Sequence, residues 1–208
     1  MHKREIIRSP INMTILIIGA LATVPLSAQQ PTCHNCPATY IERSELDTYA
    51  KRAMDNGLTD QQVRSVDLGK SQLGLGIVYR GKLDQPPKDA VAEHDFISEV
   101  YHIIEGSATL ETGPDLVDAK QRPATLQTVR EYNGPGKNAA SIVNGTTYHL
   151  KPGDVIIIPA GTGHLFTHID DHIVYLMVRI DPDKVVPLKN EAQSKAYLAT
   201  PARKGTEK

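Results

Sequence analysis

Apolar and polar residues follow two different periods along this chain. Leu46, Tyr49 and Ala53 repeat at helical spacing, and Ser44 just before them resembles the first residue of a capping box. From residue 61 to 182, apolar residues fall instead in short, β-branched runs separated by glycine, proline and asparagine. The pattern therefore predicts one helix followed by a series of short strands.

Residues 1–28 have the composition of a secretory signal. Three basic residues stand among the first eight, an apolar run over 14–26 follows, and Ser27-Ala28 offers a small-residue cleavage point before Gln29. The run is shorter than the roughly 20 residues that span a bilayer. We therefore expect cleavage near Ala28, no stable membrane anchor, and a periplasmic or secreted protein.

The two cysteines, Cys33 and Cys36, form a C-x-x-C arrangement in a segment, 29–60, that also holds the helix. A disulfide closing a small loop suits an exported chain, because it passes through an oxidising compartment. A redox pair would need a βαβ context, and a zinc site would need ligands beyond His34. Haem attachment is excluded, because Pro37 occupies the position of the required histidine.

Composition excludes one class of function. The 208 residues carry a formal net charge of −1, no Trp and two Phe, and the basic residues do not cluster with aromatic ones. Nucleic-acid binding is therefore not expected, because it requires a basic surface. The length suits one domain with a sizeable core and extensions at its ends.

Two stretches carry the most specific pattern. Their spaced residues are, in order, His94, Glu99 and Gly106 in the first, and Gly153, Pro159, Gly161 and His164 in the second. This spacing resembles the two motifs of the cupin family, G-x5-H-x-H-x4-E-x6-G and G-x5-P-x-G-x2-H-x3-N. Three motif positions differ, because Pro86 stands for the first glycine, Ala92 for the first histidine and His168 for the asparagine.

The resemblance implies an all-β fold of the cupin or jelly-roll type. In that family the strands form a double-stranded β-helix, here expected over residues 61–182 with the N-terminal helix beside it. Residues 183–208 are polar and form a tail, with a short helical pattern over 191–198.

The resemblance also implies that His94, Glu99 and His164 hold a metal inside the barrel. Two histidines and one carboxylate suit a divalent transition metal such as Fe, Mn, Zn, Ni or Cu. Residues two apart on a strand share a face, so Tyr101 should point inward with Glu99, and His168 inward with His164. Tyr101 and His168 are therefore the candidate catalytic residues.

Three details of this site leave alternatives. His94 and Glu99 are an odd number of residues apart, so both point inward only if the chain turns or bulges between them. Ala92 either opens a coordination position for water or substrate, or marks a site that has lost its metal and kept a buried His–Glu pair. His168 is a candidate for a replacement ligand, a partner of a ligand, or a general base.

The 46 residues between the two motifs exceed the short spacer of a minimal cupin. Within them, Asn144-Gly145 after a short apolar run predicts a two-residue hairpin. Long loops tend to be functional or disordered, so we expect a strand pair or a lid near one mouth of the barrel. Two strand arginines, Arg80 and Arg179, either bind a carboxylate substrate or pair with acidic side chains.

Together these patterns predict an exported metal-binding cupin. The preferred function is an enzyme acting on a small polar molecule, as a dioxygenase, isomerase or lyase. The alternative is a non-catalytic protein that binds or stores a metal or a small ligand. Fold resemblance does not choose between them, because one fold hosts many reactions. The expected partners are a small molecule and, following the family tendency, a second copy in a homodimer.

Overall fold

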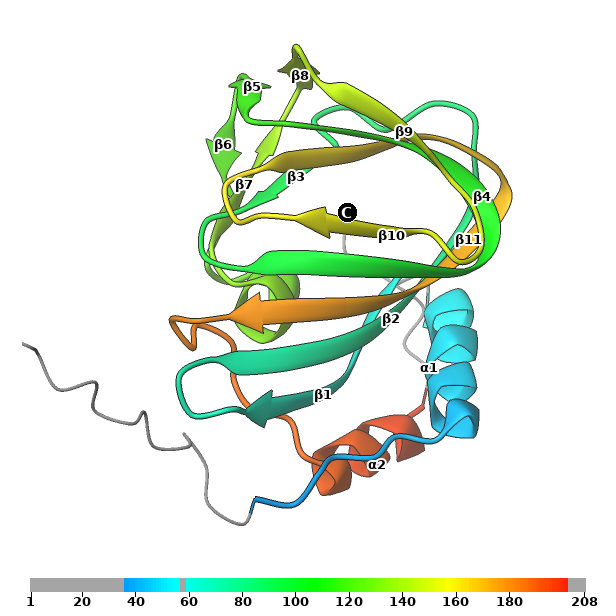
Figure 1. Ribbon diagram of the computed structural model, residues 1–208, viewed down its shortest axis with the longest axis vertical. Helices are drawn as coiled ribbons and strands as arrows, with labels where there is room; N and C mark the ends of the chain where they lie inside the picture. The colour runs from blue at the N-terminus through cyan, green and yellow to red at the C-terminus, as the bar shows by residue number, and fades with distance from the viewer. Residues whose placement is uncertain (1–35, 57–58, 202–208) are drawn as a thin grey trace, which may run out of the picture. The chain divides into compact units, whose positions relative to one another are not determined.

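The computed structural model of the protein describes residues 36–56 and 59–201 (Figure 1). The predicted signal segment, Cys33 and residues 202–208 lie outside the described residues. Cys36 is disulfide-bonded, in agreement with the disulfide interpretation of the C-x-x-C arrangement. No helix in the described part of the chain is long and apolar enough to cross a membrane.

Strands dominate the described residues, and two helices flank them. In chain order the elements are α1 (Arg43–Asn56), β1 (Asp60–Asp67), β2 (Gln72–Leu83), β3 (Val91–His94), β4 (Ser98–Gly113), β5 (Asp115–Val117), β6 (Lys120–Gln121), the π-helical turn η1 (Val129–Asn133), β7 (Gly136–Ala139), β8 (Ser141–Val143), β9 (Thr146–Leu150), β10 (Val155–Ile158), β11 (Gly163–Asp181) and α2 (Glu191–Ala199). All strand pairs are antiparallel. The predicted fold class, all-β with an N-terminal flanking helix, is confirmed.

The long strands β4 and β11 hold the sheet together. Strand β11 pairs with β2 on one side and with β4 on the other, and β4 also pairs with β9 and β10. In Figure 1 both long strands bend around a common interior. Their inward side chains, with those of neighbouring strands, form the main core: Val78, Tyr101, Ile103, Ala108, Leu110, Leu150, Ile158, Phe166, Ile169, Ile173, Tyr175 and Met177.

Both helices cover the outside of the sheet near β1 and β2. Tyr49 of α1 packs with Val63 and Ile77 in a second apolar cluster, and its ring stacks on Tyr197 of α2 at 5.8 Å. Asn190 caps α2 by accepting a hydrogen bond from the Gln193 N–H at 2.9 Å. The helices expected from the sequence in these two regions are therefore present.

The insertion between the two motifs does not form the predicted hairpin. Asn144 has a φ of 56° and does turn the chain, but β8 before it pairs with β5 and β9 after it pairs with β4. Ile142 on β8 is buried in a third apolar cluster beside Val91. Burial of this side chain thus separates two strands that the turn alone would join.

Candidate metal centre

Three strands bring His94, Glu99 and His164 together. His94 ends β3, Glu99 is the second residue of β4, and His164 is the second residue of β11. The segment 95–97 is irregular, and the Asp95 N–H donates to the Pro135 carbonyl at 2.9 Å. This break in the strand resolves the odd spacing, because it lets His94 and Glu99 face the same interior.

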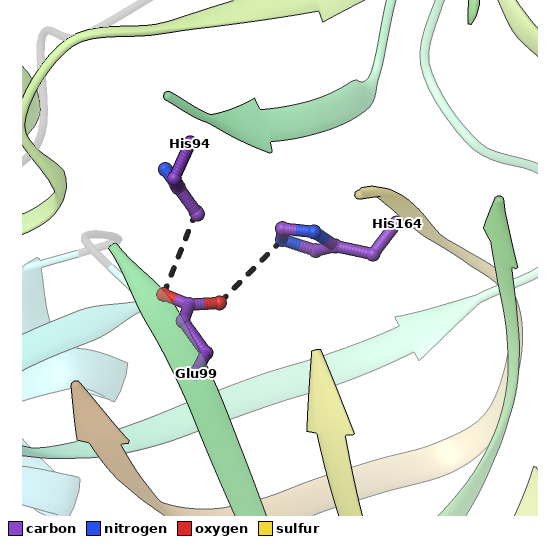
Figure 2. A group of neighbouring side chains, drawn as sticks. All are labelled: His94, Glu99 and His164. Carbon is purple, nitrogen blue, oxygen red and sulfur yellow. Dashed lines mark ion pairs between the residues drawn. The ribbon is translucent and has the colours of Figure 1, made fainter. Parts of the chain in front are cut away.

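The three side chains are buried and close enough to share one ion. His94 Nε2 lies 3.5 Å from Glu99 Oε1, and His164 Nε2 lies 3.6 Å from Glu99 Oε2. One potential ligand atom from each residue lies within 4.8 Å of the others, and no other group of this kind occurs among residues 36–56 and 59–201. Figure 2 shows both imidazoles approaching the carboxylate from one side.

The Glu99 carboxylate is fixed from its other side. Tyr101 donates its hydroxyl to Oε2 at 2.6 Å, and Arg179 donates Nε to Oε1 at 3.2 Å. Tyr101 therefore points inward as predicted. Arg179 also pairs with Asp60 and donates to Gln62 Oε1 at 2.8 Å, so the salt-bridge interpretation of this arginine is correct.

Two glycines of β2 lie beside these contacts, and the absence of a side chain at Gly74 leaves the space that the Gln62 amide occupies. A Cβ added at Gly76 would lie 3.5 Å from Arg179 Nη1, and one at Gly74 would lie 2.6 Å from Gln62 Nε2. The glycines, Asp60 and Gln62 escape motif analysis because they follow no spacing pattern. A polar run at the start of a strand, Asp60 to Gln62, is the one available signal.

Burial and neighbouring charge set the protonation of the cluster. Burial raises the pKa of Glu99, but His94, Arg179 and His164 outweigh burial and lower the pKa to about 2. Burial lowers the pKa of His94 to about 3, although Glu99 opposes this shift. Burial also lowers the pKa of His164. At neutral pH the cluster therefore holds a carboxylate and two neutral imidazoles, so no imidazolium charge opposes a cation there.

Arg122, which lies in the insertion, contacts the ring nitrogen of His94 that does not face Glu99. Its Nη2 lies 3.0 Å from His94 Nδ1 and also donates to the Glu93 carbonyl at 2.7 Å. Its Nη1 donates to the Lys137 carbonyl at 3.1 Å. The insertion thus reaches the site through an arginine that no motif marked.

His168 does not join the cluster, and its predicted inward orientation is wrong. The register of β11 against β4 shifts between Phe166 and His168, leaving Thr167 as an extra residue in a β-bulge. The bulge reverses the alternation, so Ile169 is buried, whereas the His168 side chain is 44% exposed. His168 Nε2 instead contacts Asp170 Oδ1 at 3.1 Å on the surface. This placement removes the reason for a catalytic role.

The donor set fits a divalent transition metal. With metal–ligand bonds of about 2.0–2.2 Å, neighbouring ligand atoms lie roughly 3.0–3.5 Å apart, close to the nitrogen–oxygen separations given above. A carboxylate accepts about four hydrogen bonds or ligand bonds, and the Tyr101 and Arg179 contacts use two of these positions on Glu99. The positions facing His94 and His164 are therefore free to bind an ion.

A cavity of about 250 Å³ adjoins the cluster on the side of His164. Ala92 pairs with His164 in the strand register and lines the same cavity. Ala92, one of the three positions that differ from the cupin pattern, therefore lines the cavity beside the cluster. A small molecule in this cavity would approach His164 directly.

Comparison with known proteins gives one family match. The AraC-like ligand binding domain matches residues 141–204, which include the second motif and the whole of β11. No curated protein is significantly similar to the chain.

Solved structures of low identity are similar to the chain. A protein from Bacillus halodurans is 14% identical, with 78% of this chain and 97% of that chain covered and a TM-score of 0.40. The DMSP lyase DddQ from Ruegeria pomeroyi is 18% identical, with coverages of 62% and 53% and a TM-score of 0.32. An RmlC-like cupin family protein with a double-stranded β-helix fold, from Methanocaldococcus jannaschii, is 13% identical, with coverages of 73% and 97% and a TM-score of 0.36.

The described strands carry both motifs in one barrel, and the matched segment contains the second motif together with the strand that follows it. The resemblance to cupins that the two motifs indicated is therefore confirmed at the level of the fold.

Proposed function

We propose that this protein is an enzyme that binds a divalent transition metal through His94, Glu99 and His164 and acts on a small polar molecule. The observation that carries the proposal is the convergence of these three side chains, from three strands, within 4.8 Å in a buried position beside a cavity. Fe, Mn, Zn, Ni and Cu all suit two imidazoles and one carboxylate. The proposal covers dioxygenase, isomerase and lyase chemistry.

A metal bound at this site would supply a Lewis acid that polarises an oxygen atom of the small molecule. The chain itself holds the site in place. Arg179 and Tyr101 fix the Glu99 carboxylate, and burial raises the pKa of Tyr101 so that its hydroxyl stays a donor. Tyr101 thus acts as a positioning residue, because its hydroxyl is directed at Glu99.

Metal analysis of the purified full chain tests this proposal. We expect about one transition-metal ion per chain in the wild type, and loss of that ion in Glu99→Ala. His168→Ala is the matched control, because His168 lies on the surface beside Asp170. Loss of metal in His168→Ala, or full retention in Glu99→Ala, would overturn the ligand assignment.

A second candidate is a non-catalytic protein that binds a small ligand without a metal. The match to the AraC-like ligand binding domain favours it, and so does the guanidinium of Arg122 beside His94. In that case His94, Glu99 and His164 would form a buried polar cluster. A wild-type protein that takes up no metal on reconstitution, yet binds a small molecule in the cavity, would support this candidate over the first.

We further propose export after cleavage near Ala28 and assembly as a homodimer. The composition of residues 1–28 supports the first of these. Two apolar side chains on the outer face of β10 support the second, because Val155 is 59% and Ile157 is 66% exposed. Exposed neighbouring apolar residues are common at contacts between subunits.

A further inference from the structure

A cationic side chain lines the cavity beside the candidate metal centre, next to apolar side chains. Leu83, Phe166 and Ile169 supply apolar lining, and Arg80 and Lys82 are the two cationic lining residues. Lys82 pairs with Asp84 at 3.2 Å and its side chain is 61% exposed. Arg80 lies on β2, two residues after the buried Val78, so its side chain shares the inward face of that strand. The cavity therefore offers one cation without an acidic partner, the Arg80 guanidinium, beside several apolar side chains.

The guanidinium is positioned but not neutralised. Its Nε donates to the Tyr175 hydroxyl at 3.3 Å, and its carbon lies 4.9 Å from the centre of the Phe166 ring. Within the described part of the chain, no carboxylate forms an ion pair with Arg80, whereas Arg179 pairs with both Asp60 and Glu99. The two Nη groups of Arg80 are therefore available as donors.

We propose that this cavity binds a small monocarboxylate, with its carboxylate on Arg80 and its other end toward His164. Arginine binds a carboxylate through two parallel hydrogen bonds, which fixes both the position and the orientation of the ligand. The inference rests on the proposed function only in placing the reactive end of this ligand at the metal. The contact with Arg80 itself requires no metal.

Size and charge select the ligand class. The volume of about 250 Å³ is below the range of roughly 300–1,000 Å³ of pockets for drug-sized ligands, so the ligand has few heavy atoms. The Arg80 guanidinium balances one negative charge, and Lys82 is already paired with Asp84, so a phosphate dianion would keep an uncompensated charge beside the apolar side chains. The apolar side chains that line the cavity beside Arg80 suit a short hydrocarbon chain.

Calorimetric titration of the full chain with butanoate and with butanamide tests the inference. The two probes have nearly the same shape, but only butanoate carries a charge. We expect butanamide to bind the wild type at least about tenfold more weakly than butanoate, a difference of ~1.4 kcal/mol. Arg80→Met should weaken butanoate binding by a similar factor, and the surface variant Arg130→Met should change it less than about twofold.

Equal binding of the two probes, no measurable binding of butanoate to the wild type, or unchanged binding in Arg80→Met would each overturn the inference. If Arg80→Met fails to fold, the comparison of the two probes on the wild type still decides it. Running the titration on metal-free and metal-loaded protein separates this inference from the proposed function. If butanoate binding requires Arg80 but the protein has no affinity for metal, the monocarboxylate inference holds and the proposed metal-dependent function is rejected.

Discussion

Arg122 donates a hydrogen bond from Nη2 to Nδ1 of His94 across 3.0 Å. A guanidinium has donors only, so Nδ1 must accept, and the proton of the neutral imidazole lies on Nε2. That nitrogen faces Glu99 and is the atom that would bind the metal. Metal binding therefore requires the imidazole proton to leave Nε2 while a cation stays next to Nδ1.

Replacing this arginine should strengthen metal binding. In Arg122→Gln we expect about tenfold tighter binding of Zn²⁺, because the variant removes a positive charge and can accept a hydrogen bond from a protonated Nδ1. Competition with a chelating dye measures the affinity. Arg130→Gln is the control, since Arg130 lies on the surface.

Unchanged or weaker Zn²⁺ binding in Arg122→Gln would show that the arginine does not oppose the metal. The variant must be compared at a temperature where it is folded. It loses hydrogen bonds to the Glu93 and Lys137 carbonyls, at a cost of about 1–3 kcal/mol for buried groups left unpaired.

The metal-free protein should lose stability as the pH falls from neutral. The pKa of His94 is lowered to about 3 in the folded chain from an ordinary value of 6.5, so the unfolded chain takes up the proton first between these values. Glu99, with its pKa lowered to about 2 from 4.5, acts in the same direction below pH 4.5. The His94 contribution is complete above pH 6.5 and decreases below it, and the Glu99 contribution decreases only below pH 4.5.

Thermal unfolding in a chelating buffer, followed from pH 7 to pH 4, measures this loss. His94→Gln should show a shallower decline of the unfolding temperature than the wild type, because the variant lacks the titrating imidazole. Identical slopes for the two proteins would mean that His94 is not held neutral by burial.

Gly106 and Gly153, two of the motif glycines with positive φ, should differ in their tolerance of alanine. Gly106 has a φ of 76°, and a Cβ there would lie 1.9 Å from the His172 carbonyl oxygen. Gly153 has a φ of 91° but no atom within 4 Å of its Cβ position. Gly153→Ala should cost about 1–2 kcal/mol of unfolding free energy, the backbone term alone. Gly106→Ala should cost more than ~4 kcal/mol, because the β4–β11 pairing must open.

Urea unfolding of both glycine variants gives the comparison. If Gly106→Ala and Gly153→Ala lose similar amounts of unfolding free energy, backbone strain rather than the close approach of β11 explains why both positions need glycine. The wild type under the same conditions provides the reference.

Charges on the outer face of β10 should disrupt a homodimer. In the double variant Val155→Asp and Ile157→Asp we expect a monomer, because two buried carboxylates without partners would oppose association. Sedimentation velocity measures the change, and Leu188→Asp, which alters another exposed apolar residue, should leave assembly intact. A wild type that sediments as a monomer would remove this proposal.

Sequence reasoning predicted the parts of the site that depend on spacing. His94, Glu99 and His164 stand at motif positions, and Tyr101 follows from strand alternation. His168 failed because one extra residue, Thr167, reverses the alternation, and no local signal marks where a bulge will form. Sequence spacing counts residues, whereas the face that a side chain occupies depends on the partner strand.

The contacts that hold the site in place could not be predicted from the sequence, because they join residues that are far apart in the chain. Arg122 is separated from His94 by 28 residues and reaches it through the pairing of β3, β6 and β7. The prediction of a hairpin at Asn144-Gly145 was wrong for a similar reason, since burial of Ile142 accompanies the pairing of β8 with β5 rather than with β9. Such long-range choices are made by the packing of the whole domain rather than by a local pattern.

The single methyl group of Ala92 affects two competing properties of the site, the retention of an ion and the access of organic molecules. It lines the cavity and lies opposite His164, so any larger side chain there takes its volume from the ligand. An imidazole at this position would supply a further nitrogen to an ion but would narrow the approach to it. Selection at this one residue can therefore exchange tight retention of an ion for access by organic molecules, without altering the rest of the barrel.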